Sequence, residues 1–512
     1  MQTDSLSSYM YIAARFLPFA FAIYFFSFVS ADPDLWGHIK FGEEIWKNKA
    51  LSTTDPYSFT AHGDPWTNHE WLAEVTFYLT YQSLGDAGFL LGKLIIGLFI
   101  VALLWKLCSF QKNVVLVTTG ILILAIIVIS PAFMIRPQVF SLLSFTVFAF
   151  LLYLYLQKGK DWLFILPLVM ALWVNLHGGF LIGWVILLVG AGSMTVLHFV
   201  TASGNSGRIK TLWLWTILTS LATFLNPYGY KLHLFLLNTL SVPRQISEWA
   251  PVTLFDLSFL HFKLLALLFL IIVLSRKPKW DETWQIVTVG ITLAAAVLHR
   301  RHMPFFAIMA CPYLSGRMSA LVEKFTSRHE KLILTKSSVN LLALFITLLA
   351  GYHIYGGIRP YIATKCRIVV DPSEYPVGAV KFLSINDVQG NLLLPFDWGE
   401  YAIWHLYPAC RVSIDGRFRT VYPESVIKDH FVSNDDPSGW KQLLKNHPAD
   451  VLLVNQIPFF QQMIQKKGPW TYVYSDPTSI LFLRNNHNNT SALENFKTGK
   501  FEYPDKTDPY FP

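Results

Sequence analysis

The sequence predicts a polytopic α-helical membrane protein with about eleven transmembrane helices, followed by a C-terminal extracytoplasmic α/β domain. Three observations lead to this prediction. Of the 512 residues, 53% are hydrophobic and only 14% are charged, whereas a soluble globular chain carries about 25% charged residues. Apolar runs of membrane-spanning length recur over residues 1–359. Beyond residue 359 the composition becomes that of a soluble domain.

About eleven apolar runs are long enough, or nearly so, to cross a hydrocarbon core of about 30 Å at about 1.5 Å per residue. They cover residues 9–30, 87–107, 114–131, 138–157, 162–176, 179–200, 211–226, 259–275, 283–299, 302–316 and 338–356. Some are short or adjoin one another, so the expected count has an error of one or two.

Basic residues in the connections set the expected orientation. If the N-terminus is cytoplasmic, every loop assigned to the inside is basic, as the positive-inside rule requires. These loops contain Lys106, Lys112, Lys158, Lys160, Arg208, Lys210, Arg276, Lys277, Lys279, Arg317, Lys324, Arg328, Lys331 and Lys336. An odd number of spans then places the first loop and the C-terminal domain outside the cytoplasm. The net charge of +8 belongs largely to these loops, so it does not indicate a nucleic-acid partner.

The first extracytoplasmic loop, residues 31–88, is rich in Asp, His, Glu and Trp, far beyond what a tether between two spans needs. Two amphipathic stretches, Leu35 to about Lys47 and Glu70 to about Tyr81, predict helices lying on the membrane surface. Asp-Pro pairs supply the turns between them. The loop is therefore predicted to be folded and to hold the active site.

Asp32 and Asp34 lie two residues apart across a proline, so in extended backbone their side chains point the same way. The pair suits shared metal coordination, or a division in which one carboxylate binds and the other acts as a general base. Asp34 is the predicted catalytic residue and Asp32 its support. The alternative for Asp32 is to cap the helix that begins near Leu35.

The same loop offers further ligands for a substrate. His38, Asp55, His69 and Glu70 are candidates to bind substrate hydroxyls, and the last two are also candidates to bind a divalent ion. His69-Glu70 lacks the second histidine of a zinc-hydrolase helix, so no zinc motif is present. Hydrogen bonds that lock the loop onto its neighbours are the alternative role.

Other outer connections carry Arg and His against the positive-inside trend. Because charge at a membrane face needs a partner, Arg136, Arg300, Arg301 and His302 are candidates to bind an anion. Arginines that snorkel to lipid headgroups are the alternative. His177 precedes Gly178-Gly179 at the end of a span, where a ligand can approach closely; a packed histidine is the alternative.

Beyond residue 359, strand-like and helix-like runs alternate, which predicts a small α/β domain over 360–485. Strands are expected at 367–370, 391–394, 411–414, 450–454, 470–474 and 480–483, and helices at 373–383, 398–407, 438–446 and 458–466. The segments Asp397–Tyr401 and Asp415–Arg417 are interpreted as structural turns. Residues 486–512 are expected to form a loosely ordered tail. The four cysteines lack metal-binding spacing and predict no disulfide framework.

Several segments resemble the GT-C superfamily of integral-membrane glycosyltransferases. The most similar members are bacterial and relate to protein O-mannosyltransferases, lipid A aminoarabinose transferases and rhizobial lipopolysaccharide galacturonosyltransferases. The architecture resembles theirs over the whole chain. The matching segments are Asp32-Pro33-Asp34-Leu35-Trp36, Asn68-His69-Glu70-Trp71-Leu72, Arg136-Pro137-Gln138, Asn175-Leu176-His177-Gly178-Gly179 and Asp415-Gly416-Arg417.

The resemblance implies a GT-C-like fold in the bacterial cytoplasmic (inner) membrane. It implies transfer of a hexose or pentose from a polyprenyl-phosphate-linked donor to a glycan, lipid or protein acceptor on the extracytoplasmic face. Asp34 would be the base, with Asp32 supporting it. The donor phosphate would be held by Arg136, Arg300 and Arg301, with His302 beside them, because an arginine fork suits phosphate oxygens.

The resemblance leaves the metal requirement open. Some relatives bind a metal ion with the acids of the first loop, and others need none. A divalent cation such as Mg²⁺ or Mn²⁺ would have Asp32, Asp34, His69 and Glu70 as its candidate ligands.

Two other classes of function share parts of this pattern. A transporter or flippase of lipid-linked glycans would also cross the membrane many times, but transporters tend to show repeats and polar or broken helices at mid-membrane. A non-catalytic protein of cell-envelope assembly would not need the Asp32/Asp34 pair. The predicted function is therefore that of a membrane glycosyltransferase.

Overall fold

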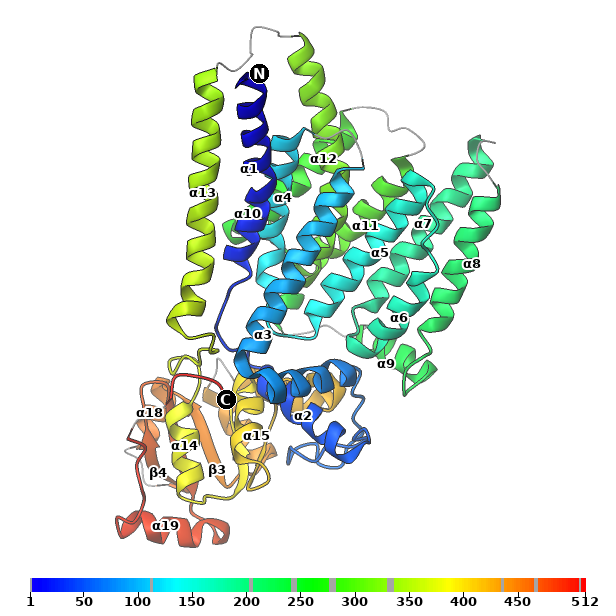
Figure 1. Cartoon of the computed structure of the whole chain (residues 1–512). Helices are drawn as coiled ribbons and strands as arrows, with labels where there is room; N and C mark the ends of the chain where they lie inside the picture. The colour runs from blue at the N-terminus through cyan, green and yellow to red at the C-terminus, as the bar shows by residue number, and fades with distance from the viewer. Residues whose placement is uncertain are drawn as a thin grey trace. The chain divides into compact units, whose positions relative to one another are not determined.

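The computed structural model describes residues 2–110, 114–201, 206–240, 246–275, 282–328, 336–433, 437–464, 468–505 and 508–512. They form two compact units (Figure 1). The helical unit comprises Met1–Phe28 and Leu90–Cys366, and the sheet unit comprises Val29–Phe89 and Arg367–Pro512. Of the basic residues expected in cytoplasmic loops, Lys112, Arg276, Lys277, Lys279 and Lys331 lie outside the described residues.

The helical unit is built from long apolar helices. They are α1 (Gln2–Phe25), the C-terminal part of α3 (Trp71–Cys108), α4 (Val115–Ile129), α5 (Gln138–Lys158), α6 (Ile165–Leu176), α7 (Phe180–Thr201), α8 (Ser206–Ala222), α9 (Tyr230–Leu240), α10 (Leu260–Leu274), α11 (Thr283–Leu298), α12 (Met303–Arg328) and α13 (Lys336–Ala363). Short 3-10 helices are η1 (Ser130–Ala132), η2 (Ser247–Trp249), η3 (Leu257–Phe259) and η5 (Arg300–His302).

All the predicted apolar runs form helices, and the chain is an integral membrane protein by this architecture. Within the described residues, eight helices are long and apolar enough to cross a membrane. The predicted runs at 162–176, 211–226 and 283–299 form α6, α8 and α11, which have 12, 17 and 16 residues. These three shorter helices account for the difference from the expected count of about eleven.

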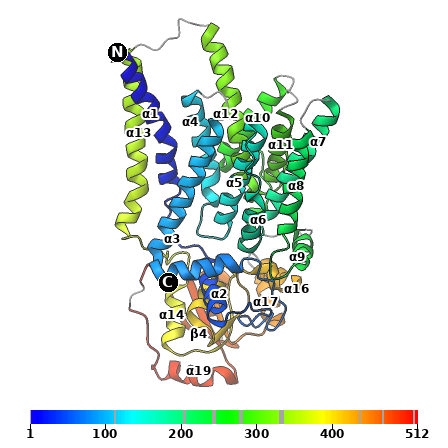
Figure 2. The same cartoon turned by 45° about the vertical axis from the view of Figure 1, so that its right-hand side comes forward.

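Helix α1 runs beside α13 in both views (Figures 1 and 2). The backbones approach closely, because a methyl group at Gly357 would overlap the carbonyl oxygen of Ile23. The ring of His353 lies 3.8 Å from that of Phe21, centroid to centroid, which adds an aromatic stack to the contact. The first and last spans therefore pack as a pair.

The sheet unit contains a five-stranded sheet in the order β2-β1-β3-β5-β4. The strands are β1 (Gly390–Leu393), β2 (Cys410–Val412), β3 (Val451–Asn455), β4 (Trp470–Ser475) and β5 (Ser479–Arg484). Its helices are α2 (Leu35–Asn48), the N-terminal part of α3, α14 (Val377–Ile385), α15 (Gly399–Leu406), α16 (Glu424–Ser433), α17 (Pro437–Asn446), α18 (Pro458–Ile464) and α19 (Thr490–Lys497), with η7 (Phe396–Trp398), η8 (Phe418–Thr420) and η9 (His487–Asn489).

The sheet is mixed. Strand β1 pairs in parallel with β2 and with β3, while β5 is antiparallel to both β3 and β4. This confirms the predicted α/β domain. The strand expected at 367–370 is reduced to single bridges of Val369 with Ser30 and Tyr510.

The first loop is part of the sheet unit. Ser58 pairs with Val412 beside β2, and Trp36 of α2 is fully buried, with its ring 4.9 Å from that of Tyr401 and 5.2 Å from that of Phe511. The first half of α2 is therefore buried against the C-terminal residues, whereas Trp46 near its end is 42% exposed. The position of α2 at the membrane surface stays a prediction. The placement of residues 31–88 in a domain with residues 1–359 stays a prediction.

Two local features complete the unit. Helix α3 is broken at Gly85, where φ is 58° and ψ is −152°, a conformation that suits glycine; the break separates the predicted surface helix from the predicted second span. The tail expected to be loose carries α19 and the buried ring of Phe511.

Candidate functional site

The acids that follow the first span lie at the start of α2. Asp34 occupies the N-cap position, yet its side chain makes no capping hydrogen bond. Asp32 is 2% exposed, and its Oδ1 accepts a hydrogen bond from the Asp34 backbone N–H at 3.1 Å. Asp32 therefore fixes the turn, and the carboxylate of Asp34 is directed elsewhere.

That carboxylate faces Glu400, from the first turn of α15. A methyl group at Gly416 would lie against Asp34 Oδ1 and 2.7 Å from Glu400 Oε1. A methyl group at Gly37 would overlap Glu400 Oε2. Because Gly37 and Gly416 have no side chains, the carboxyl groups of Asp34 and Glu400 have room to lie close together.

Glu400 is an unusual acid. It is 3% exposed, and its buried Oε2 has no hydrogen-bond partner in the described part of the chain. Burial, together with the nearby carboxylates of Asp34 and Asp415, raises the pKa of Glu400 well above its usual value. Burial and the neighbouring negative charges therefore favour the protonated form of Glu400.

The protonation of Glu400 predicts a pH-dependent stability. The stabilisation from its proton is complete below the unfolded pKa of about 4.3 and is lost as the pH rises through the raised folded pKa. Glu400→Gln has no proton to lose, so its melting temperature should fall less steeply than that of the wild type as the pH rises above the unfolded pKa of about 4.3. Thermal unfolding of the full chain in detergent measures this. Exposed Glu502→Gln should follow the wild type, and parallel curves for Glu400→Gln would contradict the assignment.

Arg417, Asp415 and Asp55 form a buried ion-pair cluster in the same unit as Asp34 and Glu400. Arg417 donates to both oxygens of Asp415 at 2.8 and 2.7 Å, and its Nη1 lies 2.7 Å from Asp55 Oδ1. Its guanidinium also stacks over the ring of Trp66, 4.8 Å from the centroid. Asp55 is 1% exposed and accepts from the backbone N–H groups of Tyr57 and Ser58. The surroundings of Asp55 favour a structural role, and its binding of substrate stays a prediction.

His38 lies within the same unit. Its Nδ1 is 3.8 Å from Glu74 Oε1, and the other oxygen of Glu74 accepts from Asn68 at 2.6 Å. Burial lowers the pKa of His38, but the carboxylates of Glu74, Glu70 and Asp34 raise it more, so the net pKa is raised. These carboxylates therefore favour the protonated form of His38.

The residues proposed as metal ligands all belong to the first loop, and their binding of a metal ion stays a prediction. His69 Nε2 lies 3.7 Å from Glu70 Oε1, while Asp32 is engaged by the backbone of Asp34. Within the described ranges, no group of three or more His, Cys, Asp or Glu side chains is placed to hold an ion. No step below therefore runs through a metal.

In the helical unit, the predicted anion-binding residues gather around η2. Arg136 Nη1 donates to Glu248 Oε1 at 3.1 Å, and the guanidinium of Arg301 lies 4.6 Å from the ring centroid of Trp249. The His302 ring meets the same indole edge-on, with 6.1 Å between the ring centroids. Arg136 and the Arg301-His302 pair come from two different segments, and both contact η2.

Arg300 and His177 have different surroundings. Arg300 Nε donates to the Pro251 carbonyl at 3.2 Å, and its guanidinium stacks over the Phe259 ring at 4.8 Å. His177 Nδ1 accepts from Gly179 N–H at 3.0 Å and lies 2.7 Å from Ser141 Oγ. A methyl group at Gly179 would meet that hydroxyl at 2.5 Å, so here the glycine permits close packing of the protein itself. Ligand binding by either residue stays a prediction.

The fold is that of the GT-C glycosyltransferases. The oligosaccharyltransferase of Archaeoglobus fulgidus, solved with a tethered acceptor peptide containing the NVT sequon, matches with a TM-score of 0.55 at 11% identity, over 93% of this chain and 74% of that chain. ArnT from Cupriavidus metallidurans, bound to undecaprenyl phosphate, matches with a TM-score of 0.50 at 10% identity, over 93% of this chain and 98% of that chain. The apo structure of the same ArnT matches with a TM-score of 0.50 at 10% identity, over 92% of this chain and 96% of that chain. No protein-family model and no curated protein matches the sequence.

Sequence reasoning did not single out Glu400 as a candidate site residue and interpreted its segment as a turn. The usable signal was a pair of acidic segments, each close to a glycine, at Asp32–Gly37 and Asp397–Glu400. Nothing in the sequence says that these segments meet. Glu248 and Trp249 were visible as a charged and aromatic pair in an outer connection, but their contact with Arg136 and Arg301 was not.

Proposed function

We propose that this protein is a membrane glycosyltransferase that moves a sugar from a polyprenyl-phosphate-linked donor to a hydroxyl group of a glycan, lipid or protein acceptor. The observation that carries the proposal is the Asp34/Glu400 carboxyl pair on a GT-C fold. A pair of neighbouring carboxyl groups, one of which has a raised pKa, is a typical device of acid–base chemistry. The undecaprenyl phosphate bound to ArnT, a structural neighbour, supports a lipid phosphate as the carrier.

Asp34 is the general base of this reaction. Its ionised carboxylate takes the proton of the acceptor hydroxyl, which requires an approach of about 3 Å. The acceptor oxygen then forms a bond to the anomeric carbon, while the bond from that carbon to the donor phosphate oxygen breaks. The polyprenyl phosphate leaves with the bonding electrons. The configuration at the anomeric carbon is inverted. The raised pKa of Glu400 favours its neutral form, which limits the electrostatic repulsion between Glu400 and Asp34.

The phosphate of the donor is bound by arginines of the helical unit, chiefly Arg136 and Arg301, with His302 beside them. The stack on Trp249 orients the Arg301 guanidinium, whose planar fork matches phosphate oxygens. Its charge also stabilises the phosphate as it departs. The proposed membrane is the bacterial inner membrane, with the N-terminus in the cytoplasm.

Arg301→Gln is expected to raise the KM for the donor by about 10- to 100-fold, because a hydrogen bond to a charged group contributes about 1.5–3 kcal/mol. The matched control is Arg208→Gln, since Arg208 donates to the Leu156 carbonyl at 3.4 Å on another helix pair and should leave this KM unchanged. Steady-state kinetics over a range of donor concentrations measure both variants. An unchanged KM in Arg301→Gln would remove this residue from the phosphate site.

The experiment that tests the function uses purified protein in proteoliposomes with radiolabelled polyprenyl-phosphate sugars and a membrane extract as the source of acceptor. Label should appear in an acceptor fraction with wild-type protein. Addition of a chelator tests whether the transfer needs a divalent cation. Donors that stay intact throughout would contradict the proposal.

A further inference from the structure

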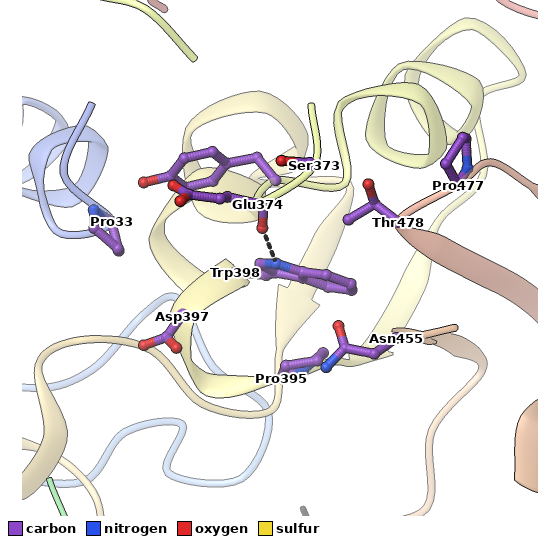
Figure 3. A pocket seen from close by; sticks show the side chains of 10 residues that line it. Pro33, Ser373, Glu374, Pro395, Asp397, Trp398, Asn455, Pro477 and Thr478 are labelled. Carbon is purple, nitrogen blue, oxygen red and sulfur yellow. Dashed lines mark hydrogen bonds between the residues drawn. The ribbon is translucent and has the colours of Figure 1, made fainter. Parts of the chain in front are cut away.

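The sheet unit contains a cavity of about 510 Å³ that the mechanism above does not use. Its lining includes Pro33, Glu374, Asp397, Trp398, Asn455 and Thr478 (Figure 3). This volume lies within the range of about 300–1,000 Å³ that is usual for pockets that bind small molecules.

The cavity lies at the edge of the sheet where ligands of α/β domains usually bind. Strand β1 continues to β2 on one side, and β3, its parallel neighbour on the other side, continues away from it to β4. The connections from β1 and from β3 therefore leave in opposite directions. Open α/β sheets bind ligands outside the carboxyl ends of the strands at such a switch point. The lining residue Pro395 follows the end of β1, and Asn455 is the last residue of β3.

The chemistry of the lining identifies the kind of ligand. The indole of Trp398 lies at the centre of the view, between Glu374 and Asn455 (Figure 3), and its Nε1–H donates to the Glu374 carbonyl at 2.8 Å, which fixes the ring. Asp397, Asn455 and Thr478 add carboxylate, amide and hydroxyl groups around it. Trp398 is 4% exposed, so the cavity presents mainly hydrogen-bonding groups, which suit the hydroxyl groups of a sugar ring.

The charge of the lining excludes the donor phosphate. Two acids, Glu374 and Asp397, line the cavity, and none of the described lining residues is Lys, Arg or His. A phosphate would meet repulsion there without a compensating cation. A neutral or cationic hydroxyl-rich ligand would not.

The cavity is joined through the backbone to the proposed base. Pro33 lies between Asp32 and Asp34, about 3.8 Å along the chain from each, Cα to Cα. Trp398 immediately precedes α15, and Glu400 lies in the first turn of that helix. The same two short segments therefore hold both the cavity wall and the carboxyl pair.

We propose that this cavity binds a neutral sugar unit of the acceptor, so that the acceptor is a carbohydrate-containing molecule. This inference rests on the proposed function, and it narrows the acceptor class from lipid, glycan or protein to a glycan or glycan-bearing molecule.

Direct binding tests the cavity independently of turnover. The full chain in detergent is mixed with a panel of neutral and amino methyl glycosides, and binding is followed by saturation-transfer NMR. At least one glycoside should bind the wild type, and Asn455→Trp, which fills the cavity, should weaken binding at least tenfold. The matched control is Asn446→Trp, which makes the same change at an exposed position on α17 and should bind normally. Inorganic phosphate should not compete.

Three results would overturn the inference: no glycoside binds, Asn455→Trp binds as well as the control, or phosphate displaces the glycoside. A second readout separates this failure from failure of the proposed function. If the protein is a transferase, Asn455→Trp should raise the acceptor KM at least tenfold and leave the donor KM unchanged. If the wild type shows no donor turnover, the proposed function fails, while glycoside binding still decides the nature of the cavity.

Discussion

Asp34→Asn is expected to lower the rate of sugar transfer by about 10²- to 10⁴-fold, the usual contribution of a general base. The amide keeps the size of the side chain but cannot accept the acceptor's proton. The measurement is single-turnover transfer at saturating donor, so that a change in binding is not mistaken for a change in chemistry. Donor KM should change little, because Asp34 is not assigned to the phosphate.

The control for this variant is Asp64→Asn, which makes the same chemical change in the same loop. It should transfer sugar at close to the wild-type rate. Equal melting temperatures of the two variants would show that the fold is intact. A rate for Asp34→Asn within about threefold of the wild type, far below the usual contribution of a base, would remove Asp34 from that role.

The largest expected effect on stability comes from Arg417→Met. Removal of this cation leaves the carboxylates of Asp415 and Asp55 buried without their partner, and breaking a buried ion pair in this way costs about 3–5 kcal/mol. The Arg417 side chain is 4% exposed and that of Asp55 is 0% exposed, so solvent does not compensate. Thermal unfolding of the full chain in detergent should show a clearly lower midpoint.

The control for Arg417→Met is an exposed pair in the same unit. Arg367 Nη2 lies 3.1 Å from Asp508 Oδ2, with side chains 42% and 61% exposed, and such surface pairs contribute at most about 1 kcal/mol. Arg367→Met should therefore unfold close to the wild-type midpoint. Similar midpoints for both variants would show that the buried cluster is not a source of stability.

The membrane helices could be predicted because their signal is local. A run of apolar residues such as 114–131 forms a helix whatever its neighbours are, since a chain in lipid must satisfy its own backbone hydrogen bonds. The alternation of strands and helices beyond residue 359 is similarly local. The choice of Asp34 as a candidate also needed only its position directly after the first span.

The rest depends on contacts between residues that are far apart in sequence. Glu400 in isolation is an ordinary acid in the first turn of a short helix, a position that the helix dipole favours; it becomes unusual only because Gly37 and Gly416 bring it to Asp34. The apolar face of α2 has the period of a membrane-surface helix. Its true partners, Tyr401 and Phe511, are more than 300 residues away in the printed sequence.

The most direct test of the account is the stoichiometry of the reaction. Proteoliposomes with a defined polyprenyl-phosphate sugar and an acceptor glycan would be analysed by mass spectrometry for free polyprenyl phosphate and for the new glycoside. The account predicts that the two products form in equal amounts with wild-type protein and that neither forms with Asp34→Asn. A donor that crosses the bilayer chemically intact, with no free polyprenyl phosphate, would contradict it and identify the protein as a transporter.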